Sequence, residues 1–213
     1  MEFINKEILD YSAKNTEHEP DLLKKLNRET WLKVMNPRML SGHIQGRVLS
    51  MLSKMIKPRN IIEIGTYTGY SALCLAEGIQ PKGKLHTIDI NEECVLIANK
   101  YFQNTIFKNN IKQHIGNALE IIPKIKCNFQ LAFIDADKEN YINYFNMIFN
   151  KLDVGGYIIA DNVLWSGKVL KKQKDVETQS LDDYNKMIIN NKKLKSVLMP
   201  IRDGLMVSEK IYE

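Results

Sequence analysis

The chain has few cysteines and no long run of apolar residues. Its 213 residues include only Cys74, Cys94 and Cys127, which are far apart and form no Cys-x-x-Cys pair. Neither a disulfide framework nor a cysteine zinc site is therefore indicated. No apolar run approaches the roughly 20 residues that a membrane-spanning helix needs, and the first residues lack the basic and apolar regions of a signal peptide. We expect a cytoplasmic protein in a reducing compartment, without a membrane partner.

The chain also lacks a strong excess of charge of one sign. It carries 30 basic and 25 acidic residues, and the lysines are scattered apart from the run at 171–174. No aromatic residues alternate with this run, so it indicates a solvated loop and not a nucleic-acid partner. We expect the surrounding polar stretch, 167–179, to be a mobile loop. With 44% hydrophobic residues, the composition and length fit one globular domain.

Two amphipathic helices are expected before the first strand. Apolar residues recur at helical spacing within 20–35 and again within 44–56, and Pro37 and Pro58 end the two segments. We expect residues 1–57 to form an N-terminal cap on a core of residues 58–213, within a single domain.

From residue 60 onward, short apolar runs alternate with longer amphipathic segments, which predicts a parallel sheet joined by helical crossovers. Strands are expected at 60–65, 84–89, 112–116, 130–135, 156–161, 195–200 and 205–211. Helices are expected at 69–78, 92–106, 118–122, 139–151 and 180–191. Because Asp203-Gly204 is a hairpin signal, the last strand should be antiparallel to the one before it. The predicted fold class is α/β, with a seven-stranded, mostly parallel sheet.

A glycine turn after the first strand predicts a cofactor site. Gly65 and Gly69 frame the turn, and Asp89 ends the next expected strand 20 residues after Gly69. An acidic residue at this distance binds ribose hydroxyls in dinucleotide folds. The bulk of Thr66 and Tyr67 lies where a pyrophosphate would approach the backbone, which favours a ribose ligand without phosphates. A dinucleotide site, or a turn without a ligand, stays open on these residues alone.

Oxygen ligands follow two other expected strands. Asp135 ends one strand, and Asp161 with Asn162 ends the next. If the two strands are neighbours, these side chains meet at the carboxyl edge of the sheet. Oxygen donors suit Mg²⁺, with Mn²⁺ or Ca²⁺ possible, and disfavour Zn²⁺. Helix capping would explain either aspartate singly, and we assign Asp137 a structural role.

Lys138 follows Asp135 by three residues and is expected at the same edge. Although most lysines are simply exposed, a partly desolvated lysine beside a cation is a candidate general base. A base of this kind suits a phenol-like hydroxyl, which ionises near pH 10.

Three segments resemble the signature segments of the cation-dependent O-methyltransferases, a family that includes caffeoyl-CoA and catechol O-methyltransferases. They are Glu63–Ser71, Ile134–Tyr141 and Ala160–Gly167. The resemblance runs from about residue 38 to the end of the chain. It implies the Rossmann-like class I methyltransferase fold, S-adenosylmethionine (SAM) and a divalent cation, a small phenolic acceptor of the catechol or caffeoyl type, and a homodimer.

The resemblance also implies roles for individual residues. Expected around SAM are Ser41, Glu63, Gly65, Tyr67, Ser71, Asp89, Gly116, Ala118 and Asp135. The expected cation ligands are Asp135, Asp161 and Asn162, with Lys138 as the base and Trp165 as a wall of the acceptor pocket. Two other functions stay open: an NAD-dependent oxidoreductase, and a SAM-binding protein without activity.

Overall fold

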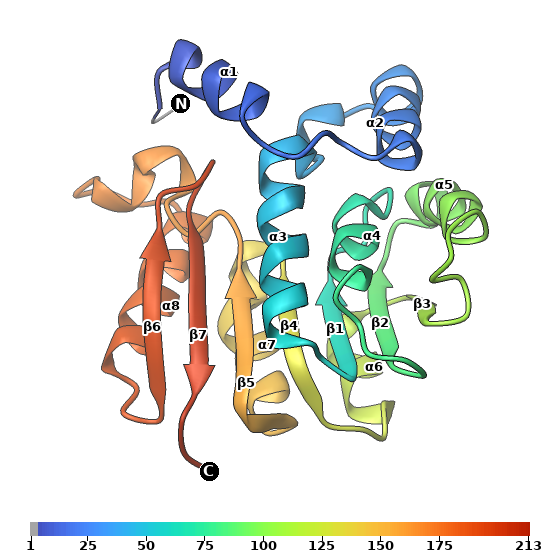
Figure 1. The fold of residues 1–213 in the computed structure, drawn as a ribbon. Helices are drawn as coiled ribbons and strands as arrows, with labels where there is room; N and C mark the ends of the chain where they lie inside the picture. Colours follow the sequence, from blue (N-terminus) through green and yellow to red (C-terminus); the bar gives the residue numbers. More distant parts are fainter. Residues whose placement is uncertain (1–3) are drawn as a thin grey trace.

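A seven-stranded sheet organises the structure, a computed structural model that describes residues 4–213 (Figure 1). The strand order is β3-β2-β1-β4-β5-β7-β6. The strands are β1 (Asn60–Ile64), β2 (Lys84–Asp89), β3 (Ile111–Ile115), β4 (Phe129–Ile134), β5 (Leu152–Ala160), β6 (Leu194–Met199) and β7 (Leu205–Lys210). Strands β1 to β5 pair in parallel, whereas β7 is antiparallel to both β5 and β6. The predicted fold class and the terminal hairpin are confirmed.

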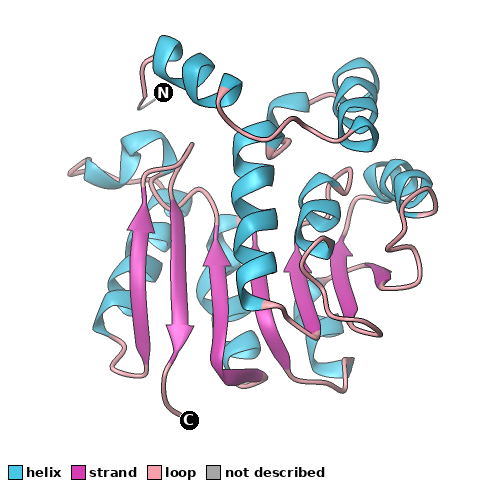
Figure 2. Ribbon diagram, in the orientation of Figure 1, coloured by secondary structure: helices cyan, strands magenta, loops and turns pink. Residues whose placement is uncertain are grey.

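Helices cover both faces of the sheet (Figure 2). The α-helices are α1 (Lys6–Lys14), α2 (Asp21–Lys33), α3 (Gly42–Ile56), α4 (Tyr70–Ala76), α5 (Glu92–Phe102), α6 (Ala118–Ile121), α7 (Tyr141–Phe149) and α8 (Val176–Asn190). The 3-10 turns are η1 (Pro37–Met39), η2 (Ile122–Lys124), η3 (Lys138–Asn140) and η4 (Trp165–Leu170). Ile61 packs in the core with α2 to α5, and its neighbour Ile62 packs with α6 to α8. Burial on both faces explains why the central strands β1 and β4 are largely apolar.

Helix α1 was not expected from the sequence. Asn5 caps its first turn by accepting a hydrogen bond from the Glu7 backbone N–H at 2.8 Å. The helix buries none of its residues. None of the helices within residues 4–213 has the length and apolar character required to cross a bilayer.

The expectation of a long loop at 167–179 is wrong at its C-terminal end. Helix α8 begins at Val176 because the Asp175 side chain caps it, accepting from the Thr178 N–H at 2.8 Å. Thr178 and Leu181 then bury one face of the helix. The first residues of the expected loop, 167–170, belong to η4, so only residues 171–175 have no regular structure.

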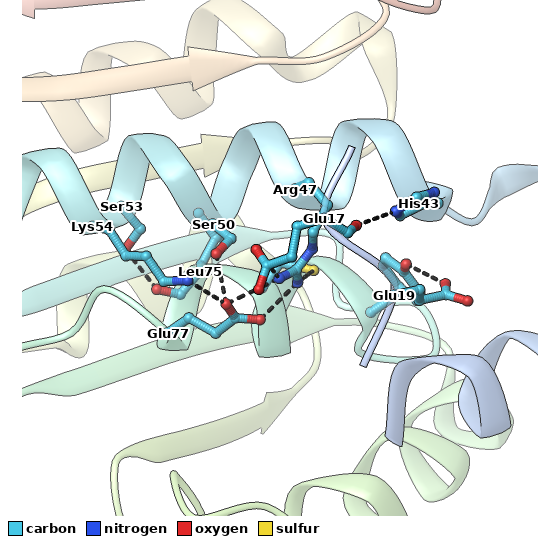
Figure 3. A network of polar contacts seen from close by, with 11 residues as sticks. Glu17, Glu19, His43, Arg47, Ser50, Ser53, Lys54, Leu75 and Glu77 are labelled. Atoms are coloured by element: carbon cyan, nitrogen blue, oxygen red, sulfur yellow. Dashed lines mark hydrogen bonds and ion pairs between the residues drawn. The ribbon is translucent and has the colours of Figure 1, made fainter. Parts of the chain in front are cut away.

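A buried ion pair fixes α3 against α4 (Figure 3). Arg47, which is 6% exposed, donates to Glu77 with Nη2 and Oε1 2.6 Å apart. Ser50 also donates to Glu77, at 2.6 Å, and Lys54 pairs with it at 2.9 Å. Glu77 thus contacts three successive turns of α3. It lies at the end of α4, the helix that follows Gly65 and Gly69. This contact places the N-terminal end of α3 beside the carboxyl edge of the sheet.

A pair of histidines joins β2 to β3. The Nδ1 atom of His86 lies 3.0 Å from Nε2 of His114, and the two rings stack. Burial, together with the nearby His114 and Lys112, lowers the pKa of His86 to about 4. Because an unfolded histidine has a pKa of about 6.5, the unfolded chain binds more protons than the folded chain between these values.

We therefore expect the free energy of unfolding to fall as the pH is lowered from about 6.5 to about 4. His86→Gln should reduce this dependence within that window. Urea unfolding at several pH values measures it, with the exposed His18→Gln as the matched control. Identical pH profiles for the His86 variant and the control would contradict this prediction.

Candidate active site

One large cavity opens at the carboxyl ends of β1, β2, β4 and β5. Its volume is about 1490 Å³, and the segment 33–41 lines one side of it. It is lined by twelve of the thirteen residues expected at the site: Ser41, Gly65, Tyr67, Ser71, Asp89, Gly116, Ala118, Asp135, Lys138, Asp161, Asn162 and Trp165. The sheet therefore brings the glycine turn and the oxygen ligands to the same cavity.

The glycine turn lies against the first candidate ligand. Gly65 has φ +99° and Gly69 has φ +89°, in the left-handed region that favours glycine. A Cβ atom on Gly65 would lie 1.9 Å from the backbone oxygen of Asp135. Only glycine therefore allows β1 and β4 to end in contact at this point.

Asp89 is held at the cavity edge by the backbone. Its Oδ2 accepts from the Tyr67 N–H at 2.6 Å, and its Oδ1 accepts from the Asn91 N–H at 2.8 Å. Each oxygen of an ionised carboxylate has a second acceptor position. The Asp89 carboxylate can therefore still accept two ligand hydroxyls, as a ribose diol requires.

Glu63 is the one expected site residue that does not line the cavity. It is fully buried below the turn, where Thr87 Oγ1 donates to its Oε2 at 2.5 Å, and its Oε1 has no protein partner. Burial raises its pKa to about 8. Its expected contact with the methionine part of SAM stays a prediction.

The three candidate cation ligands come together because β4 and β5 are neighbours, with Ile134 paired to Ala160. Lys138 Nζ donates to Asp135 Oδ1 at 3.1 Å and to Asn162 Oδ1 at 2.8 Å. The ligand oxygens thus converge on a place that favours positive charge. The donor set, two carboxylates and an amide oxygen, fits a hard divalent cation. Residues 4–213 contain no group of three His, Cys, Asp or Glu side chains suited to a metal, so the set depends on Asn162.

Asp161 is the most buried of these ligands, at 2% exposed. Burial and the neighbouring Asp135 carboxylate raise its pKa. Its Oδ1 accepts from the Asn162 N–H at 2.7 Å, and its Oδ2 accepts from Gln45 Nε2 at 2.5 Å. A divalent cation would offset the repulsion between the two carboxylates.

Tyr141 is a site residue that the sequence analysis did not identify. Its hydroxyl accepts from Lys138 Nζ at 2.8 Å and donates to the backbone oxygen of Asp161 at 3.0 Å. The tyrosine is fully buried, so it fixes the position of the amine. The spacing of three residues from Lys138, at the start of α7, was the available signal.

Trp165 lines the cavity beside Lys138. Lys138 Nζ is 5.6 Å from the centre of its ring, and Lys168 Nζ is 5.4 Å from it. Trp165 and Ser166 both have positive φ, at 46° and 52°, and Asp203 Oδ1 holds this turn by accepting from the Ser166 N–H at 2.5 Å. The indole is thus fixed as a flat wall beside the amine.

Comparisons with known proteins agree with this geometry. Residues 10–211 match the family model described as O-methyltransferase. Caffeoyl-CoA O-methyltransferase 5 of Nicotiana tabacum is 32% identical over 206 residues, covering 91% of this chain and 85% of that protein. The caffeoyl-CoA O-methyltransferase of Petroselinum crispum is 31% identical, with the same coverage of both.

Solved structures share the fold. The O-methyltransferase TomG of Streptomyces achromogenes, determined with SAM, superposes with a TM-score of 0.89 at 24% identity, over 97% of this chain and 96% of that one. An O-methyltransferase of Bacillus cereus, determined with SAH, gives 0.89 at 24% identity, over 96% and 97%. At this identity the two structures bear on the fold alone. The family match and the two plant relatives show that the chain belongs to the O-methyltransferase family, as a SAM-dependent methyltransferase.

Proposed function

We propose that this O-methyltransferase transfers the methyl group of SAM to one hydroxyl of a vicinal diol on an aromatic ring, in a reaction that depends on a divalent cation. The observation that carries the proposal is that the glycine turn and the Asp135, Lys138, Asp161 and Asn162 cluster share one cavity. Mg²⁺ is the favoured cation, with Mn²⁺ or Ca²⁺ possible. The relatives named for caffeoyl-CoA support an acceptor of the caffeoyl or catechol class.

The cofactor half of the cavity supports a SAM molecule. Asp89 offers two free acceptor positions for the ribose hydroxyls. Ser41, Tyr67 and Ser71 line the same space and would border the methionine part. Gly116 and Ala118 also line this space and would flank the adenine. Family membership does not favour the alternative of an NAD-dependent oxidoreductase. Calorimetry that compares the binding of NADH with the binding of SAM would distinguish the two functions.

In the acceptor half, Asp135, Asp161 and Asn162 would hold the cation, which when bound supplies Lewis-acid stabilisation of negative charge on oxygen. Lys138 Nζ would take the proton of the hydroxyl that is methylated, while Tyr141 holds the amine in place. Trp165 would lie against the aromatic ring. The protein's contribution is then mainly proximity and alignment of the hydroxyl with the methyl group.

Removing the cation is expected to abolish turnover. EDTA should lower the rate by at least about 10²-fold, because electrostatic stabilisation of the reacting oxygen is worth several kcal/mol, and Mg²⁺ or Mn²⁺ should restore it. Asp161→Asn should raise the cation concentration needed for half-maximal rate about 10- to 100-fold, the scale on which metal-site changes act. Asp137→Asn is the matched control, since Asp137 bonds Asn140 and Tyr144 instead. Full turnover in EDTA would contradict the proposed cation dependence.

The acceptor itself can be identified with a panel of catechols, caffeoyl esters and flavonoids, assayed with labelled SAM and Mg²⁺. Methylation of vicinal diols but not of their single-hydroxyl analogues supports the proposal. SAM binding without methylation of any acceptor would favour a protein that binds SAM without activity. The homodimer and the cytoplasmic location stay predictions, which gel filtration and fractionation would test.

A further inference from the structure

Arg202 joins the hairpin between β6 and β7 to the start of α3. Its Nη1 donates to the backbone oxygen of Ser41 at 2.5 Å and to Gln45 Oε1 at 2.9 Å. Arg202 has φ +50°, in the left-handed region that side chains other than glycine rarely adopt. The hairpin therefore directs a guanidinium to the rim of the cavity.

Gln45 lies between Arg202 and a candidate cation ligand. It is 0% exposed on α3, and its Nε2 donates to Asp161 Oδ2 at 2.5 Å. Because a guanidinium has donors only, the amide oxygen of Gln45 must face Arg202 and the amide nitrogen must face Asp161. Arg202 thereby fixes which end of the Gln45 amide Asp161 meets.

We propose that Gln45 and Arg202 are positioning residues for the cation site, Arg202 acting on Asp161 through Gln45. The inference rests on the proposed cation dependence. With Oδ1 held by the Asn162 N–H and Oδ2 by Gln45, the Asp161 carboxylate keeps one orientation, and each oxygen retains a second acceptor position for the cation. Partners that orient a ligand in this way typically change metal affinity 10- to 100-fold when they are lost.

A purely structural role would have a different signature. Arg202 also contacts the backbone of Ser41 and, at 3.4 Å from Nη2, of Arg38, so its removal could loosen the segment beside the cofactor. Such loosening would lower SAM affinity and stability whether or not Gln45 is present. Action through Gln45 instead predicts that the loss in cation affinity disappears once Gln45 is gone.

The test is a double-mutant cycle on Mn²⁺ affinity, measured by calorimetry on the full chain without acceptor. Gln45→Met should weaken Mn²⁺ binding about 10- to 100-fold, and Arg202→Met should weaken it about 3- to 10-fold, by releasing the Gln45 amide. The Mn²⁺ affinity of the double variant should be within about twofold of that of Gln45→Met, because the effects of mutating two contacting residues do not add. Additive losses would overturn the inference.

Two controls keep the outcomes separate. Gln113→Met should leave Mn²⁺ affinity unchanged. This matched change lies on β3, at the edge of the sheet, where the Gln113 side chain donates to the Val95 backbone oxygen. SAM binding by the same preparations reports whether each variant is folded. If Gln45→Met does not bind SAM, the Mn²⁺ affinity of Arg202→Met decides alone. An unchanged Mn²⁺ affinity in Arg202→Met would then overturn the inference. Tight Mn²⁺ binding by Gln45→Met would overturn this inference only, whereas no Mn²⁺ binding by the wild type would overturn the cation dependence as well.

Discussion

Lys138→Met is expected to lower kcat by about 10²- to 10⁴-fold, the range that a positioned general base contributes, with SAM affinity within about threefold of wild type. Nζ is the proposed base of the acceptor half, and its hydrogen bonds to Asp135, Tyr141 and Asn162 hold it in place. Methionine keeps most of the side-chain length and removes the amine. Steady-state rates with a saturating catechol-type acceptor measure the effect, and calorimetry measures SAM binding.

Lys168→Met is the matched control for this variant. Lys168 also lies over the Trp165 ring, at 5.4 Å, but its ion-pair partner is Asp175 and not a candidate cation ligand. Its removal should change kcat less than about threefold, because exposed ion pairs are worth about 1 kcal/mol or less. If both variants lose rate equally, the amine of Lys138 acts through packing on Trp165 and not as a base.

Gly65→Ala is expected to destabilise the fold by about 2 to 5 kcal/mol, the sum of left-handed backbone strain and overpacking. The added Cβ would meet the Asp135 backbone oxygen at 1.9 Å. Because β1 and β4 are adjacent and buried, the backbone can yield only by moving Asp135. SAM and cation affinity should fall together in the folded fraction. Urea unfolding and calorimetry measure the two effects.

Gly155→Ala separates backbone strain from the clash. Gly155 has φ +81°, close to that of Gly65, but an added Cβ there would meet nothing within 4 Å. Its loss of stability should be limited to the strain of about 1 to 2 kcal/mol, with ligand binding intact. Equal losses in the two variants would show that the contact between β1 and β4 does not restrict position 65.

The inner strands β1, β2 and β4 could be predicted well because each is short and mostly buried on both faces. The expected strand 84–89 coincides with β2, and the expected strand 60–65 differs from β1 by one residue. Helix α1, which buries no side chain, was not predicted. The start of α8 was predicted at residue 180, four residues late. The residues after Asp175 are mostly polar and were assigned to a loop, although Thr178 is buried.

Residues at strand ends could be predicted because parallel strands finish at one edge of the sheet. Asp89 ends β2, and Asp135 and Asp161 directly follow β4 and β5. Local sequence therefore placed each at the carboxyl edge, and the strand order brought them to one cavity. Glu63 was expected near the cofactor from the family resemblance, but it lies one position inside β1 and points below the turn. A shift of one residue along a strand reverses the face that the side chain occupies.

The sequence by itself determined the α/β fold, the glycine turn and the positions of Asp135, Asp161 and Asn162 at strand ends, since each of these depends on residues close together in the chain. Only the tertiary structure decided what surrounds them. Gln45 and Asp161 are 116 positions apart, and Arg202 and Gln45 are 157 positions apart, so no local pattern connects them. Their contact exists because α3 packs over the sheet while the last hairpin returns to the same edge, and burial then requires each polar group to have a partner.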